Sequence, residues 1–579
     1  MYPEKAMKIN EVLLTVIATL MFHSSAFAMG GSGATCNPST PNWGSCTLAP
    51  VPFQALVTKT INIPGGTYTT PFQANQANTR YVLQGDMTAD AAGIVIGASY
   101  VIIDLNGHTI TYNQVNPGEG VTIGPYNLHD VAVRNGSIIQ GAAKSEGDLY
   151  GRGNNPVSTY NTINQGSRSA GNFHVANLYV RYGGKDVGGI IIATTNGLFE
   201  QNTIEDTYEF GTLKNRHQGV EALTGAKNTT SEQHIYRYNT IVNTRQRGIV
   251  TGNNSEVYGN HITIRSIATN SNGIGMYAGQ GLKIHDNTII GRGEHPVGIG
   301  AGGGSGSDNY EVYNNLIDLQ ITALGEEYGS SYANDPTATY MGNAASGIRV
   351  TWGGDKLNFY NNQITIKTNA RYEGTYSPTG AKAYINGGGK GLFIGAYEGE
   401  TSTFSGNTIT VTGDGAYTYG VTCSYSFSDG MFVVNNIITS SQYNIVVGDD
   451  YGACNAYPLF QGNTLIKSGA LEGYKTITST YNETDRNSQA RFVDNVYQNG
   501  ASESSIALKP SGSGLTDIYF GNAVSNEYRY SYRLHDNNGV SSTLLREDFE
   551  PTITLSYRYP GQVLPLPFSA PVIKSINAQ

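Results

Sequence analysis

Arg, His and Glu residues recur beside short Gly-Ile segments in the middle of the chain. His217, Glu221, Arg247, His295 and Arg349 are the residues that we predict to be catalytic. β-Elimination in a uronate polymer needs a cation that neutralises the carboxylate, a base for the C5 proton and an acid for the leaving oxygen. Arg247 or Arg349 could neutralise the carboxylate, and His217 or His295 could be the base.

Further polar and aromatic residues flank the same segments, and we expect a substrate to contact them: Arg245, Tyr277, Glu294, Trp352 and Asp355. Tyr277 could also be the acid of an elimination. Hydrolysis would instead need two carboxylates about 5 Å or about 6.5–9.5 Å apart, and Glu221 with Glu294 is the pair to test. A structural role stays open for each residue, as a solvated outward side chain or as a turn residue bonded to the backbone.

Only a repeat could bring residues this far apart in the chain together. The stretch 273–291 contains a Gly-Ile strand, a glycine-bearing turn, a second strand and Asn287. Such a unit cannot bury its apolar patches alone, so it needs copies stacked on both sides. The Asn recurs after similar segments at Asn202, Asn239, Asn260, Asn315, Asn362, Asn407, Asn436, Asn463, Asn495 and Asn522.

The spacing of these Asn residues indicates three short strands per unit. From Asn239 onward the gaps are 21 to 32 residues, except for 47 before Asn362 and 45 before Asn407. The longer gaps are coils with long loops, or they hide a coil whose Asn is replaced. A three-sided parallel β-solenoid fits this period, with each Asn at the bend between the second and third strands. There it would adopt the left-handed conformation and bond to the Asn residues stacked above and below.

The third residue of each Gly-Ile segment points outward if the second and fourth fill the core. In chain order these outward residues are Ile191, Glu221, Val250, Gly275, Gly300, Arg349, Phe393, Thr422 and Val446. Two glycines between a carboxylate and a guanidinium predict a groove with a floor free of side chains. On the second strand, we predict an aromatic stack of Tyr236, Tyr258, Tyr313 and Tyr360.

The pattern G-I-x-V followed by L-x-I-x-x-N-x-I resembles the right-handed parallel β-helix repeat of the pectate-lyase-like superfamily. The resemblance covers roughly residues 81–522. It implies an all-β fold, a single-stranded right-handed parallel β-helix (three-sided β-solenoid) with end caps, and a polysaccharide bound and cleaved on the outer face of the Gly-Ile strand. The polygalacturonase signatures and the Asp cluster of calcium-dependent pectate lyases are missing, so the resemblance leaves the reaction open.

The length and composition suit one elongated, exported domain. Residues 1–28 read as a signal peptide, with Lys5, Lys8 and the cleavage site Ala26-Phe27-Ala28. We expect an irregular leader at 29–60, the β-helix at 61–522 and a C-terminal cap or tail at 523–579. A net charge of −9 argues against a nucleic-acid partner, and no segment is long and apolar enough to span a membrane. The expected location is secreted, periplasmic or at the cell surface.

The four cysteines predict two disulfide bonds in an exported chain, Cys36 with Cys46 and Cys423 with Cys454. No Cys/His spacing typical of a metal site is present, and the sequence identifies neither a cofactor nor an oligomeric state. The favoured hypothesis is a lyase for an acidic polysaccharide. A non-catalytic surface or matrix protein that binds glycan or builds a cell-envelope layer is the main alternative, and a glycoside hydrolase is the second.

Overall fold

A computed structural model describes most of the chain between residues 48 and 548. The described ranges are 48–124, 128–143, 154–159, 170–184, 187–207, 221–225, 233–266, 271–276, 280–293, 296–301, 309–321, 345–351, 356–368, 372–375, 382–385, 388–395, 402–413, 418–424, 431–448, 458–469, 476–478, 491–501, 506–507, 519–522, 529–535 and 541–548. The predicted signal peptide, Cys36 and Cys46 lie outside them.

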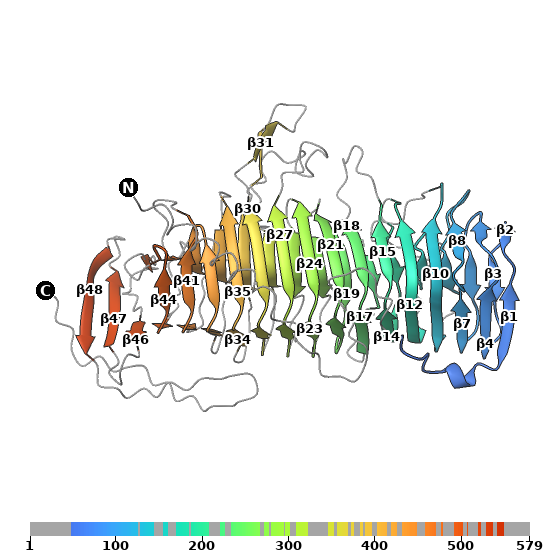
Figure 1. The fold of residues 1–579 in the computed structure, drawn as a ribbon, viewed down its shortest axis with the longest axis horizontal. Helices are drawn as coiled ribbons and strands as arrows, with labels where there is room; N and C mark the ends of the chain where they lie inside the picture. Colours follow the sequence, from blue (N-terminus) through green and yellow to red (C-terminus); the bar gives the residue numbers. More distant parts are fainter. Residues whose placement is uncertain are drawn as a thin grey trace, which may run out of the picture.

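The described residues form strands and one short 3₁₀ turn, η1 (Gln54–Leu56). Parallel strands follow one another along the long axis of the molecule in chain order (Figure 1). Each strand pairs with its counterparts in the preceding and following coils. The three strands of a coil therefore belong to three stacks of parallel strands, which we call columns one, two and three. Within a coil the chain passes through column one, then column two, then column three.

Column one begins each coil, and its strands pair in parallel register. Its members are β1 (Lys59–Ile63), β4 (Thr79–Leu83), β7 (Val101–Asp104), the first halves of β10 (Val131–Gln140) and β12 (Ala170–Tyr182), β14 (Thr194–Glu200), β17 (Gln233–Arg237), β20 (Glu256–Tyr258), β23 (Lys283–His285), β26 (Glu311–Tyr313), β29 (Asn358–Tyr360), β34 (Ser402–Ser405), β37 (Met431–Val434), β40 (Leu459–Gln461), β43 (Arg491–Val493) and β46 (Tyr519–Asn522).

Column two follows across a tight bend, and β10 and β12 run through both columns. Its members are β2 (Gly66–Tyr68), β5 (Met87–Ala89), β8 (Thr109–Tyr112), the second halves of β10 and β12, β15 (Thr203–Asp206), β18 (Thr240–Thr244), β21 (His261–Ser266), β24 (Thr288–Gly293), β27 (Leu316–Ile321), β30 (Gln363–Thr368), β35 (Thr408–Gly413), β38 (Ile437–Ser440), β41 (Thr464–Lys467) and β44 (Val496–Gln498).

Column three is a separate 15-stranded parallel sheet among the described residues. It contains the Gly-Ile segments. Its members are β3 (Phe72–Ala74), β6 (Ile94–Ile96), β9 (Val121–Ile123), β11 (Val157–Ser158), β13 (Ile190–Ile191), β16 (Glu221–Thr224), β19 (Arg247–Thr251), β22 (Ser271–Met276), β25 (Pro296–Ala301), β28 (Ala345–Thr351), β33 (Gly389–Gly395), β36 (Thr418–Ser424), β39 (Tyr443–Val447), β42 (Ile477–Thr478) and β45 (Ile506–Ala507).

A continuous apolar core lies between the columns. Most coils contribute one or more fully buried residues from each column, for example Val257 from β20, Ile262 from β21 and Ile274 from β22. The described chain is therefore all-β with long parallel sheets, which is consistent with the expected β-solenoid.

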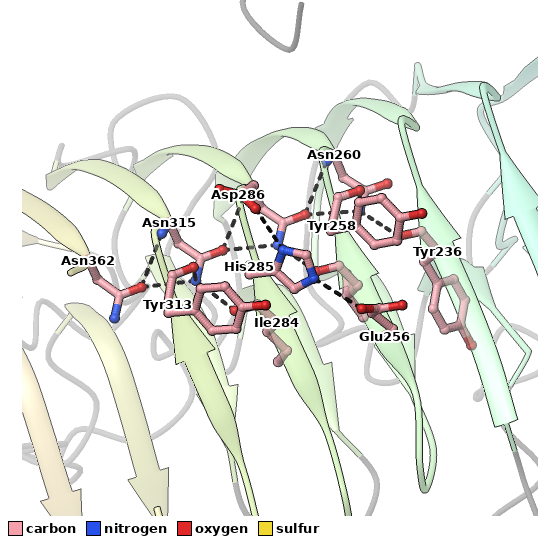
Figure 2. A network of polar contacts seen from close by, with 12 residues as sticks. Tyr236, Glu256, Tyr258, Asn260, Ile284, His285, Asp286, Tyr313, Asn315 and Asn362 are labelled. Atoms are coloured by element: carbon pink, nitrogen blue, oxygen red, sulfur yellow. Dashed lines mark hydrogen bonds and ion pairs between the residues drawn. The ribbon is translucent and has the colours of Figure 1, made fainter. Parts of the chain in front are cut away.

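Stacked Asn side chains form a ladder at the bend between columns one and two. The side-chain oxygen of each Asn accepts hydrogen bonds of 2.8–3.1 Å from the backbone N–H and the side-chain amide of the preceding one. The ladder consists of Asn202, Asn239, Asn260, Asn287, Asn315, Asn362, Asn407, Asn436, Asn463 and Asn495. Asn260, Asn315 and Asn362 are labelled in Figure 2. The predicted ladder is confirmed over these residues.

Two details of the ladder refine the prediction. Asn315 bonds directly to Asn362, and Asn362 to Asn407, so the two long gaps are single coils with long loops. The expectation that the ladder Asn itself is left-handed is wrong. The preceding residue takes that conformation instead, as Asn314 does with φ 54° and Gly406 with φ 63°.

At the C-terminal end, two antiparallel strands extend column one beyond its last parallel strand. β47 (Arg529–His535) pairs with β46, and β48 (Ser541–Asp548) pairs with β47. A further antiparallel hairpin, β31 (Tyr372–Thr375) with β32 (Lys382–Ile385), projects from the body of the molecule (Figure 1). In the leader, Val51 and Phe53 pack on Ile102 and Ala132. The domain boundaries stay predictions.

Two further sequence expectations meet the described residues. Cys423 is fully buried in β36, and Cys454 lies outside the described ranges, so their disulfide bond stays a prediction. Within the described ranges, no helix is long and apolar enough to cross a membrane.

Candidate functional site

Glu221 and Arg247 form an ion pair on column three. β16 and β19 pair in register so that Glu221 lies beside Arg247, and Arg247 Nη1 is 3.3 Å from Glu221 Oε1. The Glu221 side chain is 8% exposed and the Arg247 side chain is 25% exposed. The structure therefore brings together two of the residues that we predicted to be catalytic, with the carboxylate covered and the guanidinium reaching solvent.

Two rows of side chains run along the outer face of column three. The first outer row consists of Glu221, Arg247, Asn272, Val297, Ser346, Lys390 and Tyr419. The second outer row lies three residues further along each strand and consists of Thr224, Val250, Gly275, Gly300, Arg349, Phe393 and Thr422.

Contacts between the rows show that both lie on one face. The Nζ atom of Lys390 is 4.3 Å from the ring centroid of Phe393. A Cβ atom placed on Gly300 would come 2.9 Å from Asn272 Nδ2. Ile249, between Arg247 and Val250, is fully buried in the core instead.

The predicted outward row is confirmed by the strand register except at Glu221. Thr224, not Glu221, pairs with Ile191 on one side and Val250 on the other. Glu221 was predicted to point outward because it is the third residue of a segment that begins at Gly219. In the structure Ala222 takes the glycine position, because the N–H of Gly189 bonds to the carbonyl of Glu221 and β13 then pairs with Leu223 and Thr224.

Two glycines separate the two ends of this face. Gly275 and Gly300 are neighbours in the second outer row, and the amide of Asn272 reaches over both positions. A side chain at Gly300 would displace that amide, since its Cβ would lie 2.9 Å from Nδ2. The two glycines are therefore neighbours as predicted, but the floor is not free of side chains, because the Asn272 amide covers it.

Arg349 lies at the far end of the floor. It follows Gly300 in the second outer row on β28 and is partly exposed. Three strand spacings separate β28 from β19, or roughly 14 Å along the axis. Arg247 and Arg349 therefore mark opposite ends of one polar strip.

Lys390 is a cation on this face that the sequence did not single out. It lies in the first outer row on β33, one strand beyond Arg349, and only 7% of it is exposed. Its ammonium group packs on the Phe393 ring, as cation–π pairs do. The available signal was its position directly before Gly391 of a Gly-Ile-type segment, the position that Arg247 also occupies before Gly248.

Arg245 lies in the short corner between β18 and β19 and is 1% exposed. Its Nε is 2.8 Å from Asp206 Oδ2, and its Nη2 donates to the carbonyls of Gly184 and Val187. The guanidinium thus ties three coils together at the corner that leads into Arg247. A substrate contact by Arg245 stays a prediction.

The other predicted site residues are His217, Tyr277, Glu294, His295, Trp352 and Asp355, and they lie outside the described residues. Within the ranges that the structure describes, no group of three or more His, Cys, Asp or Glu residues is placed to hold a metal ion. The described part of the site therefore consists of the Glu221–Arg247 pair, Asn272, the glycine floor, Arg349 and Lys390.

Comparisons with known proteins leave the family open. No protein-family model matches the chain, and no curated protein matches it. Among solved structures, the chain is similar to the A-module of the Azotobacter vinelandii mannuronan C-5 epimerase AlgE6, at 12% identity over 76% of this chain and 90% of that one. The TM-score of 0.23 is too low for this similarity to bear on fold or function.

Proposed function

We propose that the protein is an exported right-handed parallel β-helix that acts on an acidic, uronate-containing polysaccharide. The observation that carries the proposal is the strip on column three, where Arg247 and Arg349 flank the floor of Gly275 and Gly300. Guanidinium groups bind carboxylates in a bidentate geometry, and the Asn272 amide over the two glycines places a neutral hydrogen-bonding group between the arginines. A carboxylated chain lying along the axis would meet both arginines.

The favoured reaction is β-elimination. Arg349 or Arg247 neutralises the uronate carboxylate, His217 or His295 takes the C5 proton, and Tyr277 protonates the leaving oxygen. Glu221 orients Arg247 through the ion pair. Arg245, Glu294, Trp352 and Asp355 complete the proposed substrate contacts.

The test is turnover on a panel of uronic-acid polymers, followed by the absorbance of the unsaturated product. Arg349→Gln should lower kcat/KM about a hundredfold or more, because a preorganised charge that stabilises the transition state is lost. Arg292→Gln is the matched control, since Arg292 is an exposed arginine on β24 of column two. Melting curves of both variants should match that of the unaltered protein.

The remaining outcomes separate the alternatives. Reducing ends without the absorbance would show a hydrolase, for which Glu221 and Glu294 would be the carboxylates. Binding of a uronate polymer without turnover would show the glycan-binding surface or matrix protein. No binding and no turnover on any uronate polymer would contradict the proposal.

A further inference from the structure

A second outward row of interest runs along column one. Tyr258, His285, Tyr313 and Tyr360 are in register on consecutive strands. Their ring centroids are 5.1, 4.6 and 4.8 Å apart, with interplanar angles of 2–3°. We call these four residues the aromatic row; Figure 2 shows its first three members side by side.

The rings of the aromatic row expose their edges, whereas their faces stack on one another. Val257, Ile284, Val312 and Phe359 alternate with the four rings and are fully buried, so the rings point away from the core. Each ring inside the row has its faces covered by its neighbours. Only a ring at an end of the row can offer a face to a ligand.

One end of the aromatic row is closed. Tyr238 packs edge-on against Tyr258, with centroids 5.5 Å apart and an interplanar angle of 81°. Arg237 Nη1 donates to the Tyr258 hydroxyl over 3.2 Å. No further ring can stack at this end without displacing Tyr238.

At the other end, no ring of the described residues packs on the far face of Tyr360. Strand register places Ser405 beside Tyr360 and then Val434 beside Ser405. All three residues are partly exposed. Because Ser405 has a small side chain, Tyr360 and Val434 face each other across two strand spacings, or roughly 10 Å. At the ring spacing of the aromatic row, one further ring fits between Tyr360 and Val434.

Polar and apolar groups surround this slot. Gly406 has the left-handed conformation, with φ 63°. Asn361 Oδ1 occupies the space beside it, 2.7 Å from the position that a Cβ atom on residue 406 would take. Phe432, two residues before Val434 on the same face, is also partly exposed. An apolar wall with a few hydrogen-bonding groups at the rim is typical of sites for small uncharged molecules.

Glu311 lies beside Asn358, two residues before Tyr360, and has Lys283 on its other side; its carboxylate disfavours an anion in the slot. Burial raises the pKa of Tyr360, and the nearby carboxylates of Glu311 and Asp286 raise it further. Burial and nearby acidic groups likewise raise the pKa of Tyr313 to about 12. A uronate in the slot would be repelled by the same carboxylates, whereas a neutral sugar would not.

We infer that the slot formed by Tyr360, Ser405 and Val434 binds one neutral pyranose ring. The C–H groups of a pyranose face carry a slight positive charge and stack on the negative face of an aromatic ring. The bound sugar would continue the aromatic row by one step, with its hydroxyl groups toward Ser405 and Asn361. This site is on column one and does not depend on the proposed uronate site.

The test is affinity electrophoresis of the full chain in gels that contain neutral glucans, xylans, galactans or mannans. At least one polymer should retard the protein. Tyr360→Leu, which removes the ring face, and Ser405→Tyr, which fills the slot with a fifth ring, should each weaken that binding about tenfold, or roughly 1.4 kcal/mol. Thr408→Tyr, which adds a ring at an exposed position on β35 in column two of the same coil, should bind as the unaltered protein does.

Two controls make the result decisive. Ser405→Tyr should keep or raise the melting temperature, since it extends the stack, so its loss of binding would not reflect unfolding. Arg349→Gln should leave neutral-sugar binding unchanged, which separates this site from the uronate site. No retardation by any neutral polymer, or unaltered binding by Ser405→Tyr, would overturn the inference.

Discussion

The outer faces of columns one and three use the same coil in opposite ways. On column one, four successive strands place rings at the same position, and the rings stack on one another from Tyr258 to Tyr360. On column three, the first outer row changes chemical type from strand to strand, from Glu221 to Arg247 to Asn272 to Val297. The backbone register is equally regular in both columns.

This difference separates stability from recognition. Identical side chains about 4.8 Å apart satisfy one another, so they stabilise the stack and offer little to a ligand. A row whose members differ cannot stack on itself and leaves charges and gaps for a partner. By this reasoning the Asn ladder and the aromatic row stabilise the fold, whereas the outer rows of column three supply the proposed substrate contacts.

The largest expected effect is the loss of an Asn inside the ladder. Asn287→Ala would remove the oxygen that accepts from the N–H and amide of Asn260, and the amide that donates to the carbonyl of Val257 and the oxygen of Asn315. Buried polar groups without partners are costly, so the free energy of unfolding should fall on the order of 3 kcal/mol. Urea unfolding followed by circular dichroism measures it.

A neighbouring asparagine supplies the control. Asn314 has φ 54° and stands one residue before the ladder position. Asn314→Gly should leave the unfolding midpoint unchanged or raise it slightly, because glycine adopts this conformation without strain. An equal loss of stability in both variants would show that the ladder has no special role.

The next expected effect concerns a polar cluster on column one. Glu200 is fully buried, bonded to His174 at 2.8 Å, to Arg237 at 2.6 Å and to the N–H of Ala49 in the leader. Burial raises the pKa of Glu200, but the hydrogen bonds and charges of His174 and Arg237 lower it more, so the net shift is downward from 4.5.

The sign of this shift gives a pH dependence. A carboxylate with a depressed pKa stabilises the fold above its unfolded value, and this stability is lost as pH falls through the folded value. Thermal unfolding between pH 6 and pH 3 should therefore show a steeper loss of stability for the unaltered protein than for Glu200→Gln. Parallel curves for the two proteins would contradict this account.

The smallest expected effect is on the aromatic row. Tyr313 stacks on His285 at 4.6 Å and on Tyr360 at 4.8 Å. Tyr313→Leu removes both ring contacts and should lower the free energy of unfolding by about 1 kcal/mol. Tyr313→Phe keeps the ring and should match the unaltered protein. Equal stability of the Leu and Phe variants would mean that the stack contributes nothing.

The features that recur from coil to coil could be predicted from the sequence, whereas some residues in coils of unusual length were assigned to the wrong position. The ladder could be read because the same amide recurs next to the same buried positions. Tyr236 was placed with Tyr258, but the register pairs it with Val257; it is fully buried and stacks on Phe199 instead. The Asn239 coil has one more residue between the aromatic residue and the Asn, which shifts Tyr236 to the inner face.

The same limit applies to the site. The row of Arg349 was predicted correctly because Gly347 and Ile348 mark its strand. The prediction for Glu221 was wrong by three residues: Thr224 takes the predicted position, because Ala222 stands where a glycine was expected. Lys390 was missed because the residue type directly before the glycine changes from coil to coil, and only its position is shared with Arg247. The outer rows of column three do not repeat one residue type. The residue at each position of a row can therefore be assigned only from the register of the paired strands.

The central claim is that the column-three strip between Arg247 and Arg349 binds a carboxylated polymer, and the affinity of the doubly substituted protein tests it most directly. Isothermal titration with a uronic-acid oligomer, at low and at 0.5 M salt, should show that Arg247→Gln with Arg349→Gln weakens binding at least a hundredfold and removes most of its salt dependence. Arg292→Gln should change neither. Unaltered affinity in the double variant, or an equal loss in Arg292→Gln, would contradict the account.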